Sequence, residues 1–381
     1  MTLQTKLPKV GTTIFSVMSQ LAAEHGAINL GQGFPDFEGP QALKDALSRA
    51  MNEGRNQYAP APGIPQLRLQ IARKTEFLYG CAIDPGTQVT VTSGATEALF
   101  AAIAATVRPG DEVIVFDPCY DSYEPAIELQ GARAVHLPLQ PPDFGLPFAQ
   151  LAAAISDRTR MIIINSPQNP TGGALQRSDL DQLAALIGDR EIYVLSDEVY
   201  EHIIYDGLAH ATVLNHPLLA PRSFAVSSFG KTYHITGWKI GYCIAPPALT
   251  AEFRKVHQYL TFCSFHPAQV ALAEFMAGDQ QHYLDLPAFY QAKRDLFVEA
   301  LSGSRFKLMP VRGSYFQLVD YSAISDLGDL DFCRWLTAEH KVAAIPLSPF
   351  CEKVPEGRYA RLCFAKEDGT LKEAAARLCR V

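Results

Sequence analysis

The sequence lacks the long apolar segments that membrane-spanning or exported proteins need. Its longest apolar stretch, around ALFAAIAATV at residues 98–107, is about half of the roughly 20 residues that cross a bilayer. The first residues, MTLQTKLPKVGTTIF, contain no apolar core of the kind found in secretion signals. We therefore expect neither a membrane partner nor export, and we predict a cytoplasmic location.

Paired cysteines and clustered metal ligands are also missing. No CxxC pair occurs among the eight scattered cysteines, and no histidines cluster at ligand spacing. This pattern predicts buried free thiols in a reducing compartment and no metal site. The cysteines are Cys81, Cys119, Cys243, Cys263, Cys333, Cys351, Cys363 and Cys379.

A basic surface is absent as well. The chain has 33 lysines and arginines against 40 acids, and the two signs are interleaved along a chain with a formal net charge of −7. No basic stripe could neutralise a phosphate backbone, so nucleic acid is not expected as a partner. What the sequence does have is 381 residues, 48% of them hydrophobic and 19% charged, which is enough for a large core and suggests two domains.

Short β-branched segments alternate with helical patterns between residues 86 and 246. This alternation predicts an α/β fold, with a mostly parallel sheet and helices on both of its faces. The predicted strands are QVTVTS, DEVIVF, RMIIIN, EIYVLS, SFAVSS and KIGYCI.

The two ends of the chain differ from this middle part. Residues 1–40 are rich in Gly and Pro and are predicted to be irregular, whereas the last third mixes both patterns. Helices are predicted there in YLDLPAFYQAKRDLFVEALSG and DFCRWLTAEHK, and strands in FKLMPV, SYFQLV and YARLCFA. We predict a large domain over residues 41–280 and a smaller α+β domain made of residues 1–40 and 281–381.

In open α/β sheets, ligands bind beyond the carboxyl ends of the strands, so the residues after each strand are informative. Residues 93–96 (SGAT) follow the first strand and lead into a helix whose N–H groups could hold a phosphate. The alternative is an ordinary turn with a threonine N-cap. Tyr120 follows the second strand, where its ring could stack on a planar ligand or pack in the core.

The later strands also end in polar residues. Asn169 lies in a turn bracketed by prolines, for which an Asx-turn is the alternative interpretation. Asp197 ends the next strand, shortly before Tyr200, and a carboxylate at that depth needs a cationic partner. The stretch SSFGKTYHITGWKIGY carries Lys231, whose ammonium is costly to bury unless it is paired or neutralised. A loop lysine that reaches water is the alternative.

One ligand class uses all of these features. Pyridoxal phosphate carries a phosphate, a flat ring, a pyridine nitrogen that must be protonated, a phenolic oxygen, and an aldehyde that forms a Schiff base with lysine. The residues at the strand ends therefore predict pyridoxal phosphate as the cofactor.

The same residues lie in phrases that resemble the class I aminotransferases of the fold-type I pyridoxal phosphate enzymes, over nearly the whole chain. Within that class, the sequence is most similar to the branch of kynurenine aminotransferases, glutamine transaminase K and bacterial methionine aminotransferases. The resemblance implies a seven-stranded, mostly parallel sheet flanked by helices, plus a smaller α+β domain. The matching phrases are NLGQGFPDF, NQYAPAPGIPQLR, DPCYDSYEP, NSPQNPTG, SDEVYEH, GKTYHITGWKIGY and YARLCFAKED.

The resemblance implies a role for each matching residue. Lys231 matches the Schiff-base lysine, which also moves the proton during amino transfer. Asp197 matches the acid that faces the pyridine nitrogen. Asn169 and Tyr200 match the residues that hydrogen-bond the phenolic oxygen, and Tyr120 matches the stacking ring.

Two further sets of residues follow from the same resemblance. The phosphate cradle is matched by Ala95, Thr96, Ser228 and Lys239. Relatives often carry an arginine in place of Lys239, and a lysine keeps the charge but not the two-pronged grip. Tyr58 in NQYAP resembles a tyrosine that reaches the phosphate of the neighbouring subunit, which implies a homodimer with shared active sites.

The substrate carboxylate has its own matches. Arg361 in YARLCFA resembles the residue that clamps the α-carboxylate, together with Asn169. Gly33 in GQGFPDF resembles the backbone position that closes over it. The alternatives are an arginine at an exposed strand edge and a plain turn glycine.

The substrate side chain is inferred partly from a missing charge. Val256–Ala292 contains no lysine or arginine, although dicarboxylate-specific relatives supply an arginine from this stretch. Aspartate should therefore be a poor donor. Phe15, Phe265 and His266 are expected to form a pocket for methionine first, and then for aromatic, glutamine-like and kynurenine side chains. Each of the three could instead be core packing, and the register of Phe265 and His266 against the family's FH pair is ambiguous by one residue.

Three functions are compatible with these residues and with the resemblance. The leading hypothesis is an aminotransferase that moves an α-amino group from an amino acid to a 2-oxo acid in a ping-pong cycle. A cysteine-conjugate β-lyase would use the same scaffold, cofactor and lysine. A coenzyme-binding regulator without activity is a remote third alternative, because no basic DNA-binding segment precedes residue 40.

Overall fold

The computed structural model describes residues 4–381 and contains a seven-stranded sheet at its centre. The strand order is β2-β8-β7-β6-β5-β3-β4, and β8 runs antiparallel to β2 and β7 while the other neighbours pair in parallel. The predicted α/β fold with a mostly parallel seven-stranded sheet is confirmed. The strands are β2 (Val89–Thr92), β3 (Glu112–Asp117), β4 (Arg133–Pro138), β5 (Thr159–Asn165), β6 (Tyr193–Asp197), β7 (Ser223–Ser228) and β8 (Gly241–Ile244).

Helices cover both faces of this sheet because its strands are apolar on both sides. Val113 and Val115 of β3 pack in the cluster that includes α4 and α9, whereas Ile114 of the same strand packs with α6 and α7. A third apolar cluster joins the β2–β8 end of the sheet to α2, α3 and α10. These helices are α2 (Gln41–Asn52), α3 (Pro65–Tyr79), α4 (Gly94–Thr106), α5 (Tyr123–Glu128), α6 (Phe148–Ala154), α7 (Arg177–Ile187), α9 (Pro247–Leu260) and α10 (His266–Gly278).

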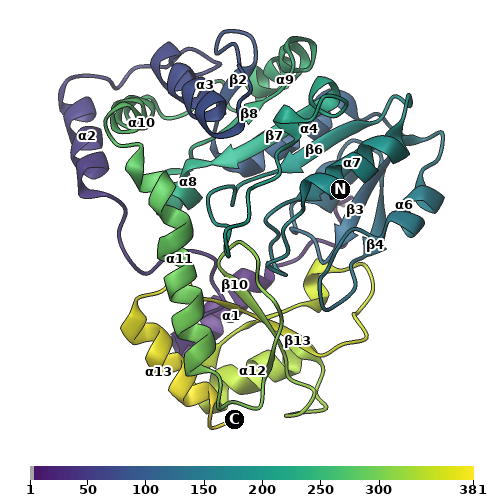
Figure 1. The fold of residues 1–381 in the computed structure, drawn as a ribbon, viewed down its shortest axis with the longest axis vertical. Coiled ribbons are helices and arrows are strands. Elements are labelled where there is room, and N and C mark those ends of the chain that lie inside the picture. The colour runs from purple at the N-terminus through teal and green to yellow at the C-terminus, as the bar shows by residue number, and fades with distance from the viewer. Residues whose placement is uncertain (1–3) are drawn as a thin grey trace.

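A second, smaller assembly lies at the other end of the molecule (Figure 1). Its four-stranded sheet has the order β12-β13-β10-β9, and a two-stranded sheet pairs β1 with β11. The strands are β1 (Ile28–Asn29), β9 (Lys307–Leu308), β10 (Phe316–Asp320), β11 (Val342–Ala343), β12 (Ile345–Pro346) and β13 (Tyr359–Cys363). The helices are α1 (Ile14–Glu24), α12 (Asp329–His340) and α13 (Asp368–Leu378).

Helix α1 corrects the prediction that residues 1–40 are irregular. Thr13 caps this helix by accepting a hydrogen bond from the Ser16 N–H at 3.3 Å. Met18 and Ala22 are buried on one of its faces, and the helix packs near α12 and β11. The N-terminal segment thus folds together with the C-terminal third of the chain.

A long helix, α11 (Gln281–Ala300), runs from the neighbourhood of α10 down to α13 (Figure 1). It begins next to the proposed boundary at residue 280, which stays a prediction together with the rest of the domain division. Four 3-10 turns and one short helix complete the described elements: η1 (Val213–Asn215), η2 (Ala220–Arg222), α8 (Phe229–Thr232), η3 (Thr236–Trp238) and η4 (Ser348–Phe350). Within residues 4–381, no helix combines the length and the apolar character needed to cross a membrane.

Candidate active site

A cavity of about 220 Å³ lies where the carboxyl ends of β5, β6 and β7 meet the start of α4. This is the position at which open α/β sheets bind their ligands. The sequence predicted most of its lining. The predicted residues that line it are Phe15, Gly33, Ala95, Thr96, Tyr120, Asn169, Asp197, Tyr200, Ser228, Lys231, Lys239 and Arg361.

One end of the cavity can hold an anion. Helix α4 begins at Gly94, whose φ of 76° favours glycine, and a Cβ there would lie 3.2 Å from the Lys239 Nζ. Glycine therefore lets the lysine ammonium approach the N-terminus of this 13-residue helix, where unpaired N–H groups already favour negative charge. The Thr96 hydroxyl lines the same cavity and lies 3.3 Å from the Tyr120 hydroxyl.

Asp197, at the end of β6, is buried without a positive partner. Its Oδ2 accepts a hydrogen bond from the Tyr123 hydroxyl at 2.7 Å, and its Oδ1 accepts from the Val199 N–H at 3.4 Å. Within residues 4–381, no lysine, arginine or histidine nitrogen lies within 4.0 Å of this carboxylate. Burial raises the pKa of Asp197 to about 6, against the hydrogen bond from Tyr123. The carboxylate therefore suits a cationic ligand group.

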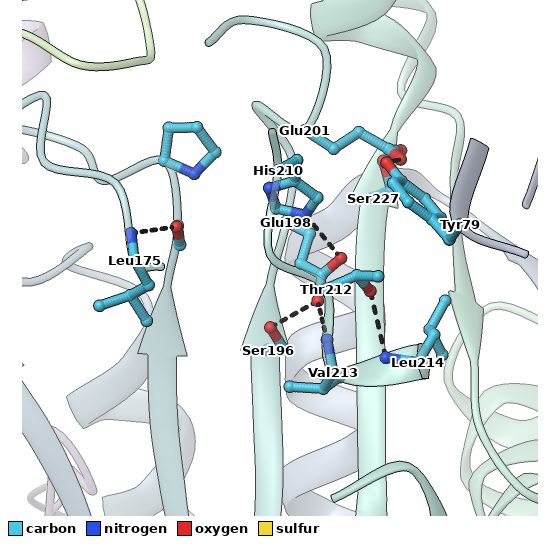
Figure 2. A network of polar contacts seen from close by, with 12 residues as sticks. Tyr79, Leu175, Ser196, Glu198, Glu201, His210, Thr212, Val213, Leu214 and Ser227 are labelled. Atoms are coloured by element: carbon cyan, nitrogen blue, oxygen red, sulfur yellow. Dashed lines mark hydrogen bonds and ion pairs between the residues drawn. The ribbon is translucent and has the colours of Figure 1, made fainter. Parts of the chain in front are cut away.

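The two glutamates that follow Asp197 differ from it, because the protein itself supplies their partners (Figure 2). Glu198 accepts hydrogen bonds from the Ser196 hydroxyl at 2.8 Å and from the His210 Nε2 at 2.9 Å. Glu201 forms a buried ion pair with Lys74 at 2.7 Å. These two acids are satisfied by the fold and need no ligand.

Asn165, the last residue of β5, is a part of the site that the sequence analysis did not identify. Its side chain donates to the Asp197 carbonyl at 2.9 Å and accepts from the Asn169 N–H at 2.9 Å. This asparagine therefore fixes the turn that carries Asn169. Its position at the end of the apolar segment RMIIIN was the available signal.

Arg361, on β13, is a second buried charge of the cavity. Its side chain is 1% exposed, which excludes the alternative of an arginine at an exposed strand edge. The guanidinium donates to the Asn169 Oδ1 at 2.8 Å and to the Gly31 carbonyl at 2.6 Å, and it lies 4.1 Å from the centre of the Phe316 ring. Burial lowers its pKa.

No carboxylate lies within 4.0 Å of this guanidinium in the part of the chain that the structure describes, and its Nε has no partner there. A buried cation with planar donors and no anion beside it could hold a carboxylate.

Lys231, in α8, directs its amine toward the smaller assembly. The Nζ donates to the Gly33 carbonyl at 2.9 Å and to the Tyr315 hydroxyl at 2.8 Å. The side chain is partly exposed where it lines the cavity, and burial of the amine lowers its pKa to about 8. Tyr315 was missed by the sequence analysis because it lies in SYFQLV, which was interpreted only as a strand.

Three predicted residues lie outside the cavity of a single chain. The Tyr58 side chain is 81% exposed and packs edge-on against Phe262, with ring centres 5.2 Å apart. Phe265 is also exposed, and His266 donates from its Nδ1 to the Gln57 carbonyl at 2.8 Å. The roles given to Tyr58, Phe265 and His266 stay predictions, and that of Tyr58 requires a second subunit.

A group of possible metal ligands lies away from this cavity. Asp117, Cys119 and His136 bring one ligand atom each within 4.8 Å of one another. The Asp117 carboxylate already accepts hydrogen bonds from the His136 ring at 2.8 Å and from the Glu352 N–H at 2.7 Å. The expected lack of a metal stays a prediction.

The chain is similar to known aminotransferases over nearly its whole length. The family "Aminotransferase class I and II" matches residues 25–378. Methionine aminotransferase of Escherichia coli is 56% identical over 98% of this chain and 97% of its own length. A probable N-succinyldiaminopimelate aminotransferase of Mycobacterium tuberculosis is 38% identical over 98% and 97%, and mouse kynurenine–oxoglutarate transaminase 3 is 33% identical over 97% and 88%. The crystal structure of YbdL from E. coli, identified as having a methionine aminotransferase function, covers both chains fully with a TM-score of 0.97 at 54% identity.

The chain belongs to the class I and II aminotransferases. It is therefore an enzyme, and its substrates are amino acids and 2-oxo acids. The resemblance to the branch with methionine and kynurenine aminotransferases is confirmed, and a regulator without activity is no longer a useful alternative.

Proposed function

We propose that this enzyme uses pyridoxal phosphate to move the α-amino group of methionine to a 2-oxo acid. The observation that carries the proposal is the set of buried charges in the cavity, Asp197 and Arg361, which have no ionic partner among the described residues. An unpartnered acid, an unpartnered guanidinium, a lysine with a lowered pKa and an anion seat at α4 fit the coenzyme together with an amino acid carboxylate.

Each residue has a defined task in this proposal. The start of α4, Lys239 and Ser228 would hold the phosphate, and Asp197 would keep the pyridine nitrogen protonated. Bound pyridoxal phosphate supplies an aldehyde that condenses with amines and a ring that withdraws electrons from the substrate α-carbon. Arg361 would hold the substrate carboxylate, so that the amine of Lys231 can exchange a proton with the α-carbon.

Methionine is proposed from the walls of the cavity. Phe15 and Phe316 flank Arg361, with its guanidinium 5.2 Å and 4.1 Å from their ring centres. Thioether sulfur packs well against aromatic rings. Val256–Ala292 supplies no lysine or arginine for a second carboxylate, whose unpaired burial would cost several kcal/mol. The identity to the E. coli methionine aminotransferase supports the same substrate.

The test compares methionine with aspartate as donors, using several 2-oxo acids as acceptors. Methionine should exceed aspartate in kcat/KM by at least about a hundredfold, which corresponds to about 2.7 kcal/mol of transition-state discrimination. Phenylalanine, tyrosine, glutamine, histidine and kynurenine should lie between the two. Equal or better performance by aspartate would contradict the proposed pocket.

The same assay addresses the β-lyase alternative, because pyruvate and ammonia released from cysteine conjugates can be measured in parallel. Borohydride reduction followed by peptide mapping tests the coenzyme itself. The reduced adduct should be found on Lys231, and an adduct on another lysine would contradict this assignment.

We also propose a cytoplasmic homodimer in which Tyr58 serves the neighbouring site. The exposure of Tyr58, Tyr259 and Phe265, at 81%, 87% and 50%, supports burial of this surface against a second copy. Mixing the inactive variants Lys231→Ala and Tyr58→Ala should restore part of the activity, since one site in each hybrid dimer carries neither change. If subunit exchange is verified and no activity returns, the sites are not shared.

A further inference from the structure

We propose that Tyr315 is a further catalytic residue, whose hydroxyl binds the free amine of Lys231 together with the Gly33 carbonyl and leaves the nitrogen lone pair available for proton transfer. The inference rests on the proposed function in one respect, namely that Lys231 is the reacting lysine. It assigns a task to a residue that lies 84 positions away in the sequence.

The hydrogen atoms in this contact can be counted. The Tyr315 hydroxyl has one hydrogen, which it donates to the Gly33 carbonyl at 2.6 Å. The Lys231 Nζ must therefore be the donor toward the Tyr315 oxygen at 2.8 Å, and it is also the donor toward the Gly33 carbonyl at 2.9 Å. A neutral amine has two hydrogens and one lone pair, so these two contacts use both hydrogens and leave the lone pair free.

The rings around Tyr315 hold this hydroxyl in place. Tyr315 is fully buried, immediately before β10, and its ring meets that of Tyr200 edge-on with centres 5.1 Å apart. Phe316 and Tyr290 pack against other sides, with ring centres at 4.9 Å and 5.7 Å. A rigid acceptor of this kind costs no reorganisation when the amine arrives.

The arrangement accounts for both directions of the proton transfer. When the neutral amine acts as a base, the α-C–H bond of the substrate breaks, its electron pair stays on the substrate, and a third N–H bond forms on Lys231. Tyr315 and Gly33 keep the other two hydrogens, so the transferred proton is the one that faces the substrate and can be given up again. The lowered pKa of Lys231, about 8, brings the neutral amine within reach of neutral pH.

Tyr315→Phe tests the inference, with Tyr290→Phe as a matched control. Tyr290 belongs to the same aromatic group, but its buried hydroxyl has no hydrogen-bond partner in the described part of the chain. In the coenzyme-free protein, the pKa of Lys231 can be measured by competitive acetylation across pH with peptide mass spectrometry. It should fall by about one pH unit in Tyr315→Phe, since the ammonium loses a hydrogen bond, and should not move in Tyr290→Phe.

The second readout is the proton transfer itself, measured with α-deuterated methionine. The rate of this step should fall about 10- to 100-fold in Tyr315→Phe and the isotope effect on kcat should rise, while KM for methionine stays within about twofold. Identical Lys231 pKa values and rates in Tyr315→Phe and Tyr290→Phe would overturn the inference.

Two further measurements keep the outcome decisive. Borohydride fixation on Lys231 in all three proteins shows that the proposed function holds, so that a null result counts against Tyr315 alone. If Tyr315→Phe does not fold, 3-fluorotyrosine placed at the same position keeps the ring and weakens the hydroxyl as an acceptor. The Lys231 pKa must then fall by a smaller amount, and an unchanged value overturns the inference.

Discussion

Two groups of buried charges, each with an acid at or shortly after the end of β6, are organised in opposite ways. In the first group, Glu201 accepts hydrogen bonds from Lys74 at 2.7 Å, from the Ser227 hydroxyl at 2.6 Å and from the Tyr242 hydroxyl at 2.8 Å. In the second, Asp197 and Arg361 have only neutral partners among residues 4–381. We call the first group closed, because the protein itself pairs its charges. We call the second group open, because its charges line the cavity and have no ionic partner among the described residues.

The pKa values follow this difference. Burial opposes the ionisation of Glu201, but the charge of Lys74 and the surrounding hydrogen bonds outweigh it and hold its pKa well below the usual range. Burial dominates at Asp197 and raises its pKa to about 6. An ion buried without a counter-charge lowers stability, and a binding site can retain it because the ligand supplies the missing charge. Ligand binding therefore explains why the charges of the open group are buried without partners.

The largest expected effect is on activity, when Asp197 and Glu201 are each changed to the corresponding amide. Asp197→Asn should lose transamination by at least about a thousandfold, since the charge facing the coenzyme is gone, while the protein stays folded. Glu201→Gln should keep activity within about tenfold, because its group does not touch the cavity. Steady-state kinetics of both variants, with circular dichroism as a control, checks this. Near-normal turnover in folded Asp197→Asn would remove the basis of the comparison.

A smaller effect is expected at the open cation. Arg361→Lys keeps the charge but loses the planar grip, so kcat/KM for methionine should fall about a hundredfold. The fall should be much smaller for 3-methylthiopropylamine, which has the same side chain and no carboxylate, when single-turnover reactions are compared. An equal loss for both amines would show that Arg361 does not hold the carboxylate.

The last expected effect is a change in the free energy of unfolding of the coenzyme-free protein, and its sign distinguishes the two acids. The raised pKa of Asp197 contributes stability below about pH 4, which is lost as the pH rises through about 6. Asp197→Asn should therefore be more stable than the wild type at pH 8, with a free energy of unfolding higher by about 3 kcal/mol, and should differ little from it at pH 4.

Glu201 should show the opposite sign in the same experiment. Because its pKa is lowered, the stability that it contributes is present above about pH 4.5 and is lost as the pH falls. Glu201→Gln should therefore be less stable than the wild type at pH 8. Urea unfolding of both variants at the two pH values measures this, and a change of the same sign in both would contradict the distinction between closed and open charges.

The sequence was sufficient for features that depend on local pattern. The apolar runs on β3, β5 and β7 gave the sheet, and the residues that follow each run gave most of the cavity, because the carboxyl ends of parallel strands meet at one edge. Strand β4 was not identified from its pattern, since an edge strand with exposed Arg133 and Pro138 lacks a continuous apolar run. Helix α1 was missed because glycines and prolines around it dominated the composition of residues 1–40.

Contacts between distant residues could not be predicted in this way. Nothing local distinguishes Tyr315 from a strand residue, and its contact with Lys231 depends on how the segment before β10 meets α8 in the tertiary structure. The same holds for Asn165, whose partners are set by the turn at Asn169. Residue type thus indicated which chemistry is present, and the tertiary structure decided which groups meet.

The pairing of β1 with β11 has a consequence for the synthesis of the chain. Ile28 aligns with Val342, so the N-terminal segment leaves the ribosome about 300 residues before its partner strand. At roughly 5–20 residues per second, this delay is about 15–60 s. All strands of the seven-stranded sheet, which ends at Ile244, emerge during that interval, whereas the apolar face of α1 has no α12 or β11 to cover it. Helix α1 is thus made well before α12 and β11, but it can pack in its place only after both have emerged.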